Sequence, residues 1–235
     1  MKTAARTHIG LVRASNQDAL LTVPGKYGLY GVADGMGGHK AGDVASRIAV
    51  ATMERTLQGA KPSEKMLRAA IEEASLLIYE TQEKHPEMSG MGTTLTVIWE
   101  DKNRVLLGHV GDSRAYLLRD GEIRQVSQDH SMVGEMVRDG ILTPEEAAVH
   151  PYRNIITRAL GTDDSVLVDI AELDKKKGDI YLICSDGLYE YVKDQQMRDI
   201  LLNKPLEEAA EVFITLALEG GGRDNVSVVL AEVTA

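Results

Sequence analysis

The sequence contains a single cysteine, Cys184, so no disulfide can form within the chain. Cys184 lies in the apolar run 180–184, and a cysteine in a buried strand is more often an inert core residue than a nucleophile. Chains without disulfides are typical of reducing compartments. We therefore expect a cytoplasmic location.

Long apolar runs are also absent. No stretch approaches the roughly 20 residues needed to span a bilayer, and residues 1–18 lack the apolar segment of a signal peptide. The formal net charge of -10 disfavours non-specific binding to nucleic acid or to an anionic membrane surface. We therefore expect neither nucleic acid nor membrane among the partners.

Aromatic residues make up only 4% of the chain, and no aromatic-rich pocket for a nucleotide base is evident. The hydrophobic fraction of 43% and the charged fraction of 26% are typical of a folded globular domain. No tandem repeat, low-complexity tract or linker marks a boundary. The expectation is one domain over residues 1–235.

Short apolar runs alternate with longer amphipathic ones. Val, Ile, Leu, Thr and Tyr are enriched in the predicted strands, over residues 27–33, 93–100, 104–110, 113–119, 123–126, 180–184 and 226–233. Apolar residues at helical spacing predict helices over residues 42–57, 63–84 and 205–219. The turn Asp120-Gly121 is a strong hairpin signal and favours antiparallel pairing. These elements predict an α+β fold with helices covering antiparallel sheets.

Residues 128–160 interrupt the alternation of short apolar and longer amphipathic runs, and we interpret them as an insertion. A short helical pattern covers residues 131–138, and Thr143 with Glu146 forms a capping-box signal for a second short helix. A long, partly helical insertion on a rigid scaffold is often functional. The alternative, a plain surface cover, stays open.

Aspartates recur at the ends of the apolar runs. Asp34, Asp112 and Asp186 each follow a run, and Asp224 precedes one, as an antiparallel neighbour at the same sheet edge requires. Carboxylates packed together repel, and cations relieve the repulsion. Oxygen ligands favour Mg(II), Mn(II) or Ca(II) over structural zinc. The alternative is that each aspartate simply belongs to a turn.

The glycine-rich stretch VADGMGGH covers residues 32–39. It lacks the Lys-Ser/Thr pair of a P-loop and does not match GxGxxG. A glycine beside Asp34 permits close backbone approach, so the carbonyl of Gly35 could bind a hard metal ion. The stretch therefore favours a metal site over a cradle of amides for phosphate.

With these motifs the chain resembles the metal-dependent Ser/Thr protein phosphatases of the PP2C (PPM) family, in particular the compact single-domain members from bacteria. The resemblance covers nearly the whole chain. Its motifs, in family order, are RASNQD at 13–18, VADGMGGH at 32–39, GMGTT at 90–94, GDSR at 111–114, DHS at 129–131, the stretch from 150 to 161, SDG at 185–187 and GRDN at 222–225. Each motif is weak alone, whereas their order and spacing are specific.

The resemblance implies a four-layer α-β-β-α sandwich of two antiparallel sheets flanked by helices, with residues 128–160 as a flap. It also implies two to three divalent cations, Mn(II) or Mg(II). In the family pattern Asp34 bridges two metals, and the carbonyl of Gly35 binds one of them. Asp186 and Asp224 complete the other.

Two further aspartates have implied roles. Asp18 would act through a water ligand, and Asp112, with Asp186, would hold the third metal of bacterial members. No departure from the family signatures suggests an inactive relative.

The implied activity is hydrolysis of phosphoserine and phosphothreonine in proteins by direct attack of a metal-bridging water, without a covalent enzyme intermediate. Arg13 would bind the substrate phosphate through two parallel charged hydrogen bonds. His39 would protonate the leaving alkoxide. The alternative for His39 is an exposed loop residue or a partner of the metal ligands.

Two other functions remain open at this point. One is a non-catalytic module that binds a phosphorylated protein; the joint presence of Asp34, Asp186 and Asp224 argues against it. The other is a hydrolase of small phosphates or nucleotides, which the scarcity of aromatic residues disfavours. From bacterial relatives we expect phosphorylated proteins as substrates, a cognate Ser/Thr kinase and a monomeric enzyme.

Overall fold

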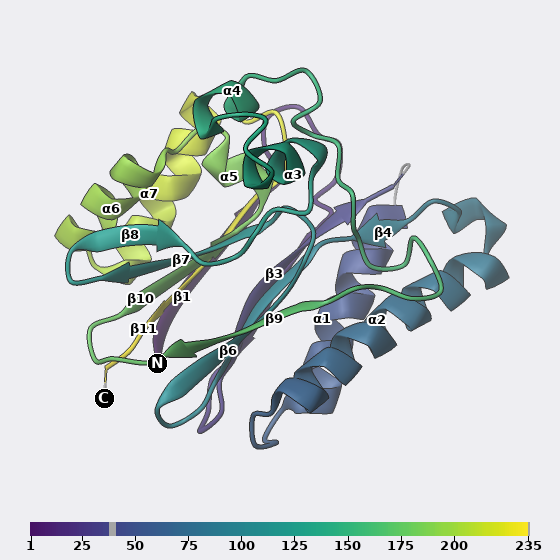
Figure 1. Ribbon diagram of the computed structural model, residues 1–235, viewed down its shortest axis with the longest axis horizontal. Coiled ribbons are helices and arrows are strands. Elements are labelled where there is room, and N and C mark those ends of the chain that lie inside the picture. The colour runs from purple at the N-terminus through teal and green to yellow at the C-terminus, as the bar shows by residue number, and fades with distance from the viewer. Residues whose placement is uncertain (38–40, 235) are drawn as a thin grey trace.

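Two antiparallel sheets face each other, and helices cover the outer face of each (Figure 1). The computed structural model describes residues 1–37 and 41–234. One sheet has the strand order β1 (Lys2–His8), β11 (Val226–Glu232), β10 (Ile180–Cys184), β7 (Arg114–Arg119) and β8 (Glu122–Gln125). The other has the order β2 (Asp18–Val23), β3 (Leu29–Met36), β5 (Leu95–Glu100), β6 (Arg104–Val110) and β9 (Asp169–Asp174), with the short β4 (Gly92–Thr93) paired to β3.

The helices belong to separate layers. The sheet that contains β3 is covered by α1 (Ala41–Leu57) and α2 (Glu64–Lys84), and the sheet that contains β11 is covered by α6 (Asp194–Asn203) and α7 (Leu206–Glu219). The short helices are α3 (Met132–Arg138), α4 (Pro144–Ala148), α5 (Asp186–Tyr189) and a 3-10 turn over Pro86–Met88. Within the described residues, no helix is both long and apolar enough to cross a bilayer.

Three groups of buried side chains fill the spaces between the layers. Trp99 and Met53 belong to the group between α1, α2 and their sheet, and Phe213 belongs to the group beneath α6 and α7. Tyr30 and Tyr181 belong to the group between the two sheets. Three such interfaces make four layers, so the predicted α-β-β-α sandwich is confirmed.

The predicted elements are present, with small shifts at their ends. The segment 93–100 is divided into β4 and β5, and β3 continues two residues beyond Asp34, so that this aspartate lies within the strand rather than after it. Asp120 and Gly121 both have positive φ, 53° and 80°, as a tight hairpin turn requires. The capping box of Thr143 and Glu146 opens α4.

Three strands, β1, β2 and β9, were not predicted. Each lies at the edge of its sheet, where one side of the strand has no neighbour. Many of their side chains are only half-buried or are exposed, so their sequences lack the continuous apolar runs of the central strands. The edge strand β8 was predicted all the same, because the Asp120-Gly121 turn joins it to β7, and no such turn signal marks the other three.

Trp99 tests the layered core, because its side chain is fully buried. Replacing it with alanine is expected to lower the free energy of unfolding by about 3–5 kcal/mol through lost burial and a residual cavity. Urea denaturation followed by far-ultraviolet circular dichroism measures the loss, since the variant has no tryptophan to report by fluorescence. Leu202→Ala, at a side chain that is 48% exposed, is the control, with an expected change within about 0.5 kcal/mol. Similar losses in both variants would contradict this packing.

Candidate metal and active site

Five aspartates from both sheets lie close together at one end of the sandwich. Asp18 and Asp34 face each other across β2 and β3. Asp112 follows β6, Asp186 opens α5 directly after β10, and Asp224 precedes β11. The charges of the other four all act on Asp34. The structure thus brings together the aspartates that the sequence singled out.

The five carboxylates are costly to ionise together. Burial, followed by repulsion from Asp18, raises the pKa of Asp34 well above its ordinary value. Burial, followed by repulsion from Asp112, does the same to the pKa of Asp186. Burial also raises the pKa of Asp18 to about 6 and that of Asp112 to about 7. Bound cations are the usual means of stabilising such a group in its ionised form.

Two oxygens of the group have the character of metal ligands. Asp18 Oδ1 and Asp186 Oδ1 are buried without a hydrogen-bond partner, while Asp18 Oδ2 accepts a bond of 2.9 Å from Ser185 Oγ. No three His, Cys, Asp or Glu side chains in the described part of the chain could hold a metal ion by themselves. Mg(II) usually takes only one or two carboxylates and keeps several waters. The residues therefore fit hard divalent ions bound by few side chains and by water.

Gly35 leaves no room for a side chain. A Cβ at this position would lie 2.1 Å from the Gly42 carbonyl oxygen and 2.6 Å from the Gln17 carbonyl oxygen. The Gly35 N–H donates to that Gln17 oxygen at 3.1 Å. Glycine at this position therefore lets the first turn of α1 and the segment before β2 close against the strand that carries Asp34.

Arg13 reaches the same group of aspartates. Its Nη2 donates to Asp224 Oδ2 at 2.5 Å, although the side chain is 52% exposed. The bond to Asp224 raises the pKa of Arg13. The predicted phosphate-binding residue is thus paired with a predicted metal ligand. Because a guanidinium has five N–H donors, it can bind Asp224 and a phosphate together.

His39 lies outside the described residues, which exclude 38–40. Cys184 is fully buried in β10, and burial raises the pKa of its thiol, so it has the character of an inert core residue.

Comparison with known proteins identifies the family. Residues 8–220 match the family model described as Protein phosphatase 2C. The chain belongs to the protein phosphatase 2C family. The resemblance carried by the sequence motifs is therefore confirmed.

The chain is similar to phosphatases from bacteria. The chain is 44% identical over 236 residues to the serine/threonine protein phosphatase PstP of Mycobacterium tuberculosis, covering 99% of this chain and 45% of PstP. It is 42% identical over 241 residues to the serine/threonine phosphatase stp of Listeria welshimeri, covering 99% of this chain and 96% of that protein. The chain thus spans under half the length of PstP and nearly all of the Listeria protein.

Solved structures share the fold. The crystal structure of the M. tuberculosis phosphatase PstP/Ppp has a TM-score of 0.93 at 42% identity, covering 100% of this chain and 99% of that one. The catalytic domain of PstP in complex with two manganese ions has a TM-score of 0.88 at 41% identity, covering 100% and 98%. The protein phosphatase 2C sandwich is therefore the fold of this chain.

In this phosphatase 2C sandwich, Asn225 organises the segment that carries Arg13, a role that the sequence analysis missed. Its Oδ1 accepts from the Gln17 N–H at 2.8 Å, and its Nδ2 donates to the carbonyls of Ile9 at 2.9 Å and Ser15 at 3.0 Å. Asn225 thus holds the segment on both sides of Arg13. The only sequence signal was its position directly after a predicted ligand.

The raised pKa values predict how stability changes with pH. In the folded chain the pKa values of Asp18, about 6, and Asp112, about 7, exceed the ordinary value of 3.8, so their protonated forms stabilise the fold at low pH. This stabilisation is lost as the pH rises through 6 and 7. We expect the Tm in EDTA to fall by several degrees between pH 5 and pH 8, since about 1 kcal/mol corresponds to about 2–4 °C at this chain length.

Scanning calorimetry in EDTA and in Mn(II) measures this effect. Mn(II) should raise the Tm more at pH 8 than at pH 5, because the ionised carboxylates are the metal-binding form. Asp112→Asn should reduce the slope in EDTA. A Tm that rises between pH 5 and pH 8 in EDTA would contradict the assignment.

Proposed function

We propose that this chain is a metal-dependent protein serine/threonine phosphatase that hydrolyses phosphoserine and phosphothreonine by direct attack of water. The observation that carries the proposal is the group of five aspartates around Asp34, all buried or partly buried, with Arg13 beside it. Membership of the protein phosphatase 2C family and the similarity to a phosphatase domain with two manganese ions support it.

The chain offers ligands for two to three divalent cations, Mn(II) or Mg(II). We assign the metal sites to the residues Asp18, Asp34, Gly35 through its carbonyl, Asp112, Asp186 and Asp224. When bound, the ions supply an activated water and offset negative charge on the phosphoryl group. Ser185 orients Asp18 through the bond to Oδ2. Asn225 keeps the Arg13 segment in place.

Arg13 would hold the phosphate for in-line attack, because its half-exposed guanidinium already lies at the edge of the aspartate group. His39 would donate a proton to the leaving serine or threonine oxygen. The reaction needs no protein nucleophile, and Cys184 is buried away from solvent.

We further propose that residues 128–160 act as a flap that shapes substrate access. Large apolar side chains on this segment are exposed, with Ile141 at 66%, Val149 at 78% and Tyr152 at 53%. Phosphorylated proteins as substrates, a cognate Ser/Thr kinase, a monomeric state and a cytoplasmic location complete the proposal. The names of the bacterial relatives support the class of substrate.

A phosphatase assay with Asp34→Asn tests the proposal. The wild-type chain should hydrolyse phosphoserine and phosphothreonine peptides with Mn(II) or Mg(II), and EDTA should abolish turnover. Asp34→Asn should lower kcat/KM by about 100-fold or more, because the central carboxylate of the metal group is lost. Asp163→Asn, at an exposed aspartate, is the matched control and should match the wild-type chain.

The alternatives give different results in the same assay. A preference for nucleotides over phosphopeptides would favour a small-phosphate hydrolase. Binding of a phosphoprotein without turnover in any metal would favour a binding module. Undiminished turnover of Asp34→Asn with added Mn(II) would refute the assigned site.

His39→Ala tests the source of the proton. General acid catalysis raises the rate by about 100-fold or more when the leaving group is poor. The variant should therefore lose about that much activity on a phosphoserine peptide. The leaving group of p-nitrophenyl phosphate needs little protonation. On this substrate the variant should therefore lose at most about tenfold in activity. Equal losses on both substrates would exclude the role of general acid.

A further inference from the structure

His130 is fully buried where the two ends of the flap meet the turn after β6. Its backbone N–H donates to the Gly111 carbonyl at 2.8 Å, and its carbonyl accepts from the Thr157 N–H at 2.8 Å. Next to it, Ser131 forms a bridge with Ile156. His130 thus joins both ends of the flap, at its own position and at Thr157, to Gly111, the residue before Asp112.

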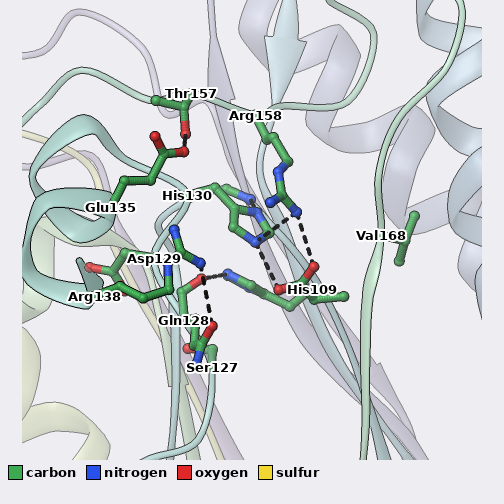
Figure 2. A network of polar contacts seen from close by, with 12 residues as sticks. His109, Ser127, Gln128, Asp129, His130, Glu135, Arg138, Thr157, Arg158 and Val168 are labelled. Carbon is green, nitrogen blue, oxygen red and sulfur yellow. Dashed lines mark hydrogen bonds and ion pairs between the residues drawn. The ribbon is translucent and has the colours of Figure 1, made fainter.

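The imidazole of His130 is held in one orientation (Figure 2). Its Nδ1 accepts from the Gly111 N–H at 3.1 Å, and its Nε2 lies 3.1 Å from Asp169 Oδ2. Figure 2 shows His130 beside Arg158, whose Nη1 lies 3.2 Å from the same Nε2. Since a peptide N–H can only donate, Nδ1 is unprotonated and Nε2–H donates to the carboxylate. Arg158 Nη1 donates to the other oxygen of Asp169 at 3.0 Å. His130 therefore bonds to Gly111 through both its ring and its backbone.

A second buried histidine supports this arrangement from β6. The rings of His109 and His130 have their centroids 4.7 Å apart. His109 Nε2 lies 2.9 Å from the Gln128 carbonyl, and because a carbonyl only accepts, Nε2 carries the proton. Figure 2 shows the two rings together with Gln128 at the start of the flap. His109 thus fixes the first residue of the flap and packs against His130.

Gly111 packs closely against Thr94 in a conformation that requires glycine. Its φ of +109° is a conformation that favours glycine, and a Cβ there would lie 2.5 Å from the Thr94 side chain. The next residue, Asp112, is 5% exposed. The position of the Asp112 carboxylate therefore depends on the backbone that His130 holds.

Asp129 makes a parallel connection to the aspartate group. Arg114 donates to both of its oxygens, with Nε to Oδ1 at 3.1 Å and Nη2 to Oδ2 at 2.7 Å. The guanidinium carbon of Arg114 lies 3.8 Å from the centroid of the Tyr189 ring, in the helix that begins at Asp186. The consecutive residues Asp129 and His130 thus both reach the aspartate group from the base of the flap. His130 bonds to Gly111, which precedes Asp112, and Asp129 bonds to Arg114, which packs on the helix that begins at Asp186.

We propose that His130 is a positioning residue that couples the base of the flap to the Gly111-Asp112 turn, so that flap order and divalent cation binding at Asp112 depend on each other. The coupling rests on the proposed function, because Asp112 is a proposed metal ligand. The contact that carries it is the bond from the Gly111 N–H to His130 Nδ1.

Two substitutions separate the two sides of the imidazole. His130→Asn places an amide oxygen near Nδ1, so it can accept from Gly111, whereas His130→Gln places an amide N–H near Nε2 and can donate only to Asp169. His130→Gln should weaken the Mn(II) binding step that is lost in Asp112→Asn by about tenfold, the size of effect expected when a group that orients a ligand is lost. The loss for His130→Asn should be at least about threefold smaller.

Isothermal titration of Mn(II) without substrate measures these affinities, with Asp112→Asn as the reference. In the double variant Asp112→Asn/His130→Gln, the His130 substitution should change Mn(II) binding no further. Limited proteolysis of the exposed flap segment 141–152 provides a second measurement. Mn(II) should slow cleavage of the wild-type chain and have little effect on Asp112→Asn, a comparison that does not require any His130 variant to fold.

Several results would overturn the coupling. These are equal losses in His130→Asn and His130→Gln, a His130→Gln effect that persists in the Asp112→Asn background, or Mn(II) protection of the flap in Asp112→Asn equal to that in the wild-type chain. A wild-type chain that binds Mn(II) but hydrolyses no phosphopeptide refutes the proposed function and leaves the coupling measurable by titration and proteolysis.

Discussion

The mutual repulsion of five clustered aspartates, two of them buried and three partly buried, is the constraint on which the rest of the structure depends. Burial and neighbouring negative charge raise the pKa of Asp34, and the same causes act on Asp186. A fold that gathers such groups must hold each one by other contacts. Arg13 offsets part of the charge through Asp224, and Ser185 binds one oxygen of Asp18. The aspartate group is thus held by neutral and positive neighbours from distant parts of the chain.

The supporting contacts follow from the backbone as much as from side chains. Gly35 and Gly111 occupy positions where a Cβ would collide with neighbouring atoms, so the chain segments beside Asp34 and Asp112 pack closely. Asn225 uses three hydrogen bonds to hold the loop before β2. At the flap base, His109 bonds to the carbonyl of Gln128, and His130 accepts from the N–H of Gly111. Rigid surroundings of this kind are what a preorganised hydrolytic site requires.

The sequence predicted the central strands, the main helices and the position of each aspartate beside an apolar run because these features are local, but it did not show that the aspartates come from two different sheets. A buried strand has a continuous apolar run, and a ligand at its end is adjacent in sequence. The edge strands β1, β2 and β9 were missed because they are only partly buried. The roles of Asn225 and His130 were missed for another reason. Their partners, such as Ile9 for Asn225 and Asp169 for His130, are distant in sequence, and only the tertiary fold brings them together.

The origin of the aspartates in two different sheets has a mechanical consequence. Asp18 and Asp34 belong to strands of one sheet, Asp186 and Asp224 flank strands of the other, and Asp112 lies where the chain crosses from β6 to β7. The distances between the carboxylates therefore depend on how the two sheets pack against each other. A sliding of one sheet over the apolar layer that includes Tyr30 and Tyr181 would change the spacing of the carboxylates without touching any of them. Residues buried deep between the sheets thus share in setting the dimensions of the site.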